Sequence, residues 1–159
     1  MNAAAKKMYF TLEEANQRLP LVRAIVQDIV DLFRDIQERR ERLAHIRQRP
    51  GAAHHHEESL YTEELQQTET EIEKDIDRVD AFVDELRQLG AELKDPLSGL
   101  VDFLTLIDER DAYLCWKLGE DEIGYWHELD AGFQGRQSLL EKSVPCDESV
   151  ESDSVEDRP

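Results

Sequence analysis

The segment between residues 100 and 136 concentrates side chains that could do chemistry. They comprise one histidine, one thiol, one arginine and four carboxylates, namely Asp102, Cys115, Glu120, His127, Glu128, Asp130 and Arg136. An imidazole beside carboxylates can transfer protons or bind a divalent cation. One hypothesis is therefore a metal or acid–base site built from His127, Asp130 and Asp102, with Glu120 as a further candidate.

The same residues also allow a structural interpretation, which the pattern favours. Arg136 could pair with Asp102 or Asp130 and fix an irregular C-terminal loop onto a sheet. His127 and Asp130 lack the spacing of the helical His-Glu-x-x-His motif, so no recognised metal-ligand pattern is present. The sequence does not identify a cofactor.

Two other features have chemical potential but favour simpler interpretations. Cys115 lies between Leu114 and Trp116, so we expect a small buried hydrophobe. As a nucleophile it would need a pKa lowered by His127. Three consecutive histidines, His54–His56, are typical of an exposed loop, because adjacent side chains rarely converge on one ion.

Strands must position the C-terminal side chains. Alternation of apolar and polar residues predicts an antiparallel sheet of three or four strands over 91–94, 99–107, 112–118 and 123–127. A turn at residues 119–122 would bring His127 toward the region of Tyr113 and Cys115. Asp102, on a neighbouring strand, could then complete a His–carboxylate pair. Gly132 and Gly135 mark an irregular closing segment.

The residues before the predicted sheet favour helices. Thr11 and Glu14 have the spacing of a capping box, which predicts a short helix over 12–19 that ends because Pro20 is unsuited to a helix interior. An apolar heptad pattern from Val22 to Ile46, with Arg39 as its only polar member, predicts a helix of about 30 residues that ends at 49–51. A second long helix is expected over 57–89, with Gly90 as its cap.

Two long helices joined by a short loop pack antiparallel, and the charges agree with that arrangement. Residues 34–49 hold six arginines and three acids, whereas residues 57–95 hold fourteen acids and four bases. Bases near the end of one helix and acids near the start of the next suit both helix dipoles. Because a two-helix hairpin leaves apolar edges uncovered, we expect a homo-oligomer or a helical protein partner.

The predicted fold class is therefore α+β, a long antiparallel helical hairpin preceded by a short capped helix and followed by a small antiparallel sheet. We expect a single domain over 8–140, with a helical part over 12–89 and a β-rich part over 91–138. Residues 141–159 hold seven acids and two bases without periodicity, which predicts a disordered acidic tail.

Composition excludes several classes of partner. The 37 acids and 19 bases of the 159-residue chain give a net charge of −18, which argues against binding to nucleic acid or to an anionic membrane surface. No apolar run approaches the roughly 20 residues of a membrane span, and the N-terminal residues do not resemble a secretory signal. Two cysteines, Cys115 and Cys146, fit a reducing compartment, so we expect a cytoplasmic location.

Several motifs together closely resemble a prokaryotic family, domain of unknown function 2203, over residues 8–138. They are Phe10–Asn16 followed by Leu19–Arg23, then Gly99–Phe103, Tyr113–Glu120, and Tyr125–Phe133 with Gly135 and Arg136. Leu104 stands where the family often has proline, and Lys117 replaces a frequent arginine. The resemblance implies a small cytoplasmic prokaryotic protein with no established activity or catalytic residues.

The sequence thus favours a non-enzymatic interaction or assembly protein that uses its helices. The alternative is a small enzyme, or a metal- or ligand-binding protein, that uses the His–carboxylate cluster. DNA binding through the arginines of residues 34–49 is disfavoured, because the acidic second helix is expected to neutralise them.

Overall fold

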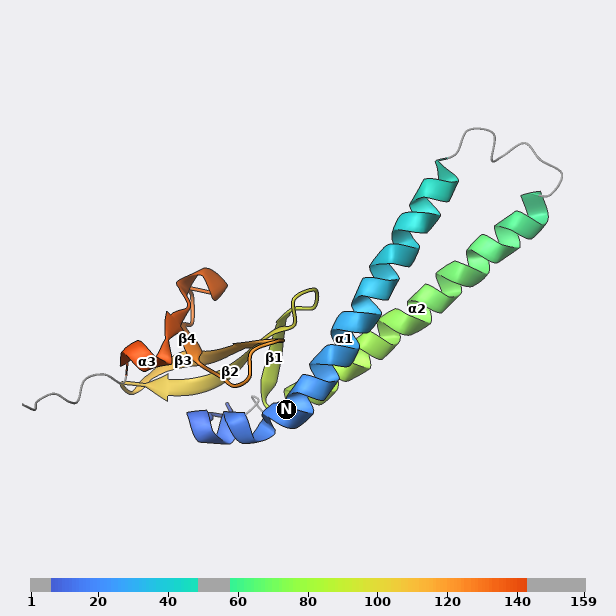
Figure 1. The fold of residues 1–159 in the computed structure, drawn as a ribbon. Coiled ribbons are helices and arrows are strands. Elements are labelled where there is room, and N and C mark those ends of the chain that lie inside the picture. The colour runs from blue at the N-terminus through green and yellow to red at the C-terminus, as the bar shows by residue number, and fades with distance from the viewer. Residues whose placement is uncertain (1–6, 49–57, 143–159) are drawn as a thin grey trace, which may run out of the picture.

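The computed structural model describes residues 7–48 and 58–142, in which two long helices precede a five-stranded antiparallel sheet, an α+β fold (Figure 1). The helices are α1 (Leu12–Arg47), α2 (Glu58–Gln88) and the short α3 (Leu139–Lys142). The strands are β1 (Ala91–Asp95), β2 (Leu100–Ile107), β3 (Arg110–Lys117), β4 (Tyr125–Glu128) and β5 (Gln137–Ser138), with a 3-10 turn η1 (Phe133–Gly135) before β5. None of the described helices is long and apolar enough to cross a membrane.

Helix α1 begins with the predicted capping box. The Glu14 amide donates to the Thr11 hydroxyl, and the Thr11 amide donates to the Glu14 carboxylate. The prediction of a separate short helix over 12–19 is wrong, because α1 continues through Pro20. An internal proline costs about 3 kcal/mol, but Leu19 and Val22 on either side of it are buried and hold both turns in the core. The helix bends in its blue N-terminal part, as helices with an internal proline do (Figure 1).

The sheet is a meander in which each strand pairs with its neighbours in the chain, in the order β1-β2-β3-β4-β5. A two-residue turn joins β2 to β3, and both of its residues, Asp108 and Glu109, have positive φ, as such tight hairpins require. The sequence predicted three or four strands. It missed β5, which has two residues and is too short to show alternation.

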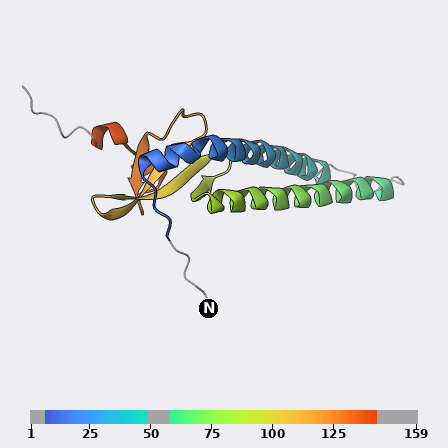
Figure 2. The same cartoon turned by 90° about the horizontal axis from the view of Figure 1, so that it is seen from below.

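One face of the sheet packs on the N-terminal half of α1. Figures 1 and 2 both place the first turns of α1 beside the sheet. Phe10, just before the helix, meets Phe103 of β2 edge to face, with 5.4 Å between ring centroids. The core of this layer combines apolar side chains of α1 with those of three strands: Leu19, Val22, Val26, Val101, Phe103, Leu114, Trp116 and Trp126.

The rest of α1 and α2 extends beyond the sheet, and the two helices lie side by side in both views (Figures 1 and 2). We call residues 34–47 and 62–79 the arm. Its contacts run in opposite order along the two helices, because Arg39 pairs with Asp75 and Arg47 pairs with Glu69 at 2.7 Å. Ile36, Leu43 and Ile72 are buried between the helices. The histidine run at 54–56 and most of the predicted acidic tail, residues 143–159, lie outside the described residues.

Candidate functional site

Strand register brings three chemically active side chains onto the sheet face opposite α1. Asp102 of β2 lies across from Cys115 of β3, and His127 of β4 lies across from Tyr113 of β3. Alternation along β3 puts Tyr113 and Cys115 on the same face, so Asp102, Cys115 and His127 share that face. All three are almost fully buried, with exposed fractions of 2%, 0% and 3%. We call these three residues the buried polar group.

The histidine and the aspartate form the expected pair. His127 Nε2 lies 3.0 Å from Asp102 Oδ2, and Nδ1 lies 2.8 Å from the backbone carbonyl of Glu128. Because a carbonyl can only accept, Nδ1 carries a proton. Nε2 and Asp102 therefore share one further proton, as an ion pair or as a neutral imidazole and carboxylic acid. Burial raises the pKa of Asp102, and the proximity of His127 only partly opposes that effect.

Cys115 lies beside this pair as a neutral thiol. One donor atom from each member of the buried polar group lies within 4.8 Å of the others. Burial, together with the charge of Asp102, raises the pKa of Cys115 to about 12. An activated nucleophilic cysteine has the opposite shift, so the environment of Cys115 opposes that alternative.

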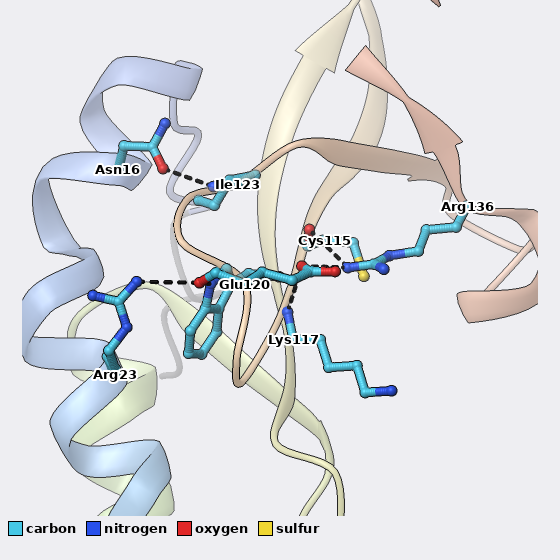
Figure 3. Close-up of polar contacts among 8 residues, drawn as sticks. Asn16, Arg23, Cys115, Lys117, Glu120, Ile123 and Arg136 are labelled. Atoms are coloured by element: carbon cyan, nitrogen blue, oxygen red, sulfur yellow. Dashed lines mark hydrogen bonds and ion pairs between the residues drawn. The ribbon is translucent and has the colours of Figure 1, made fainter. Parts of the chain in front are cut away.

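A second polar pair lies next to the buried group. Arg136 Nη2 donates to Glu120 Oε1 at 2.7 Å and approaches the backbone carbonyl of Cys115 at 3.5 Å (Figure 3). The guanidinium also stacks over the ring of Tyr125, 4.1 Å from its centroid. The expectation that Arg136 pairs with Asp102 or Asp130 is wrong, because Glu120 is its partner. This contact fastens the segment before β5 over the β3–β4 connection.

Helix α1 holds the same connection from the other side (Figure 3). Arg23 Nη2 donates to the carbonyls of Glu120 and Asp121 at 3.2 and 2.8 Å, and the Ile123 amide donates to Asn16 Oδ1 at 2.9 Å. Sequence reasoning gave Asn16 and Arg23 no role. Their signal in the sequence is that they end two of the motif segments, Phe10–Asn16 and Leu19–Arg23.

The structure thus separates the candidate residues into three sets. Asp102, Cys115 and His127 converge, whereas Glu120 and Arg136 form the adjacent pair. The Glu128 side chain instead faces Arg110, at 3.7 Å, and contributes only its carbonyl to His127. Asp130 is exposed and lies outside the group that could hold a metal among the described residues, where Cys115 takes the place expected for it.

The arm has two shallow grooves, one on either side of Leu43, each with an apolar floor and a charged rim. The first is lined by Arg39, Arg42, Leu43, Ile46, Glu64, Leu65, Thr68 and Glu71. The second is lined by Arg40, Leu43, Ala44, Arg47, Glu69, Ile72, Glu73 and Ile76. Within the described part of the arm no large apolar side chain is fully exposed, since Ile46 and Leu65 are half-buried on the groove floor.

Comparison with known proteins gives a family match. The model of a family described as "Uncharacterized conserved protein (DUF2203)" matches residues 8–139. No curated protein and no solved structure matches the chain.

Proposed function

The chain belongs to the DUF2203 family of uncharacterised conserved proteins, and we propose that it is a non-enzymatic assembly protein whose arm pairs with the arm of a second copy. In this proposal α1 and α2 form an antiparallel hairpin with a coiled-coil seam, within one domain over residues 8–140 of a cytoplasmic protein. Two hairpins together make a four-helix arrangement.

The observation that carries the proposal is the division of charge between the two helices of the arm. Residues 34–47 hold five arginines and three acids, whereas residues 62–79 hold seven acids and two bases. The pairs Arg39–Asp75 and Arg47–Glu69 use only part of this charge. Arg40 and Arg42 are exposed and form no ion pair among the described residues. Glu64 and Glu73 on α2 are likewise exposed and form no ion pair there.

In a two-fold symmetric dimer, the basic helix of one arm can meet the acidic helix of the other arm at two places. In a symmetric dimer the same patch serves both copies, so α1 of each copy can lie against α2 of the other. Both cross-contacts then join a basic helix to an acidic one. The floor of the first groove offers Ile46 and Leu65 as half-buried apolar surface that a partner helix would cover. This is why a second copy fits better than a helix of uniform charge.

The expected association is moderate and depends on salt. One exposed ion pair contributes about 0–1 kcal/mol, so the dimer depends on the sum of many pairs and on the apolar floor. Salt screens exposed charges over about 10 Å at 0.1 M. We therefore expect dimers at low ionic strength and dissociation as salt is added.

Sedimentation equilibrium at two ionic strengths tests the proposal. The expected result is the mass of two chains at low salt and a lower apparent mass at high salt. The mass of one chain at every salt and protein concentration would contradict it.

A second candidate function uses the sheet in place of the arm. The convergence of Asp102, Cys115 and His127 supports a small enzyme or a metal- or ligand-binding protein. The two functions can be separated by experiment, because the arm extends away from the sheet that holds the buried polar group (Figure 1).

A further inference from the structure

We propose that Asp102, Cys115 and His127 bind one zinc-type divalent cation through a carboxylate oxygen, a thiolate sulfur and the Nε2 nitrogen. This inference is independent of assembly through the arm, and it gives the second candidate function a specific ligand. It replaces the expected ligand Asp130 with Cys115.

The geometry places the three donors close to the arrangement that such a cation needs. The donor atoms lie within 4.8 Å of one another, and Nε2 is 3.0 Å from Asp102 Oδ2. Ligands at about 2.0–2.3 Å from a tetrahedral Zn²⁺ are roughly 3.3–3.8 Å apart. Binding therefore requires the donor atoms, which lie on three adjacent strands, to move by about 1 Å relative to one another. Three protein donors leave a fourth position for water or another small ligand.

His127 is already oriented as a metal ligand. Its Nδ1 donates to the Glu128 carbonyl at 2.8 Å, which fixes both the tautomer and the ring plane. Metal-binding histidines characteristically have such a partner on the nitrogen that does not bind the metal. The free lone pair of the neutral ring is then on Nε2, the atom that faces Asp102 and the Cys115 side.

Asp102 Oδ1 has no hydrogen-bond partner of normal geometry among the described residues, and the weakly donating Cys115 thiol is the other group that interacts with this carboxyl group. Its side chain is 2% exposed, and Oδ1 has no hydrogen-bond partner there, whereas Oδ2 contacts His127. A buried polar atom without a partner costs about 1–3 kcal/mol. A cation between the carboxylate, the thiol and the imidazole removes that cost, which a proton shared with His127 alone does not.

Charge balance and donor type select the class of cation. One carboxylate and one thiolate neutralise a charge of +2, so the loaded group is neutral, as a buried site requires. Mixed sulfur, nitrogen and oxygen donors suit Zn²⁺ and similar transition metals, whereas Mg²⁺ and Ca²⁺ prefer oxygen alone. The nearby cations Lys94 and Arg136 do not oppose binding strongly, because each pairs with its own acid, Glu92 or Glu120.

Titration of the metal-free full chain with Co²⁺ alone tests the proposal. Cobalt bound to a thiolate gives a charge-transfer band in the near ultraviolet and tetrahedral bands in the visible, so the spectrum reports which donor is used. We expect both at one Co²⁺ per chain, with loss of the bands when Zn²⁺ is added.

Variants assign the ligands. Cys146→Ser is the matched control, because it removes the other cysteine of the chain and should keep the thiolate band. Cys115→Ser should abolish the band, and Asp102→Asn should weaken Co²⁺ binding at least roughly ten-fold. If Cys115→Ser does not fold, the band in Cys146→Ser still identifies Cys115 as the sulfur donor.

Three results would overturn the inference. They are the absence of stoichiometric Co²⁺ binding, a thiolate band that disappears in Cys146→Ser, and binding without a thiolate band. The last result would assign the cation to the histidine run at 54–56 or to surface acids.

Discussion

His127 Nε2 lies 3.0 Å from Asp102 Oδ2 on the buried polar face of the sheet, with its other ring nitrogen held by the Glu128 carbonyl. The two side chains come from β2 and β4, which lie on either side of β3, so they also tie together strands that are not neighbours. In the metal-free protein this contact is part of the stability of the fold.

Removing one member of this pair should destabilise the fold. We expect Asp102→Ala to lower the free energy of unfolding of metal-free protein by about 3 kcal/mol, because it leaves a buried imidazole without its partner. Urea unfolding followed by the fluorescence of the buried Trp116 and Trp126 measures this effect. Asp130→Ala, at an exposed position, is the control and should change the value by less than about 0.5 kcal/mol. Equal stabilities of the two variants would show that the buried contact contributes nothing.

Alanine substitutions at three glycines distinguish the cost of backbone strain from the cost of steric clash. Gly99 has φ +74°, and an added Cβ would lie 2.7 Å from Leu118 and 2.9 Å from Val26. Gly119 has φ +109° with open space around it, and Gly124 has open space without a positive φ. We expect Gly119→Ala to cost about 1–2 kcal/mol from strain and Gly99→Ala to cost more. Gly124→Ala should be close to neutral. Thermal unfolding of the three variants gives the order, and a reversed order of Gly99 and Gly119 would refute the close packing at Gly99.

The arm should weaken in acid because of Asp75. The hydrogen bond from Arg39 holds the pKa of Asp75 below its usual 3.8. A group with a depressed folded-state pKa stabilises the fold above its unfolded pKa, and this contribution is lost as the pH falls through the folded value. The arm should therefore lose helical stability below about pH 4. Circular dichroism melts between pH 6 and pH 2.5 measure this loss.

Asp75→Asn should remove most of that pH dependence. Asp84→Asn is its control, because Asp84 forms a similar helical pair with Arg87 but is largely exposed. We expect the control to keep the acid loss of the wild-type chain. If both variants behave alike, Asp75 is not the group responsible.

Sequence patterns predicted the elements that repeat and missed what depends on tertiary contacts. The capping box at Thr11, the two long helices and the strand alternation that places Cys115 all follow from local spacing. The continuation of α1 through Pro20 does not, because burial of Leu19 and Val22 against the sheet decides it. The pair β4–β5 depends on a segment that returns to the sheet after an irregular turn.

The candidate site could likewise be predicted only where local strand patterns determine it. Asp102 and His127 could be paired in advance because strand order and period two place them on one face. The neighbours Leu114 and Trp116 predict apolar packing for Cys115, although the alternation of the strand turns those neighbours to the opposite face. Asp130 follows the end of β4, where no periodicity fixes the direction of a side chain. The partner of Arg136 likewise depends on the path of the closing segment.

The central claim, that the arms of two copies pair basic helix to acidic helix, is tested most directly by mixing two charge variants. Arg40→Glu with Arg42→Glu leaves both helices of the arm with a net negative charge, and Glu64→Lys, Glu71→Lys and Glu73→Lys together leave both with a net positive charge. Each variant alone should be a single chain by light scattering at low salt, because like charges then face each other across the dimer. Glu122→Lys with Asp130→Lys adds positive charge outside the arm, at exposed positions, and should leave association unchanged. An equimolar mixture of the two arm variants should restore the mass of two chains, since both cross-contacts become complementary again.

Two results would contradict the account. One is that either variant alone associates as strongly as the wild-type chain, and the other is that the mixture stays at the mass of one chain.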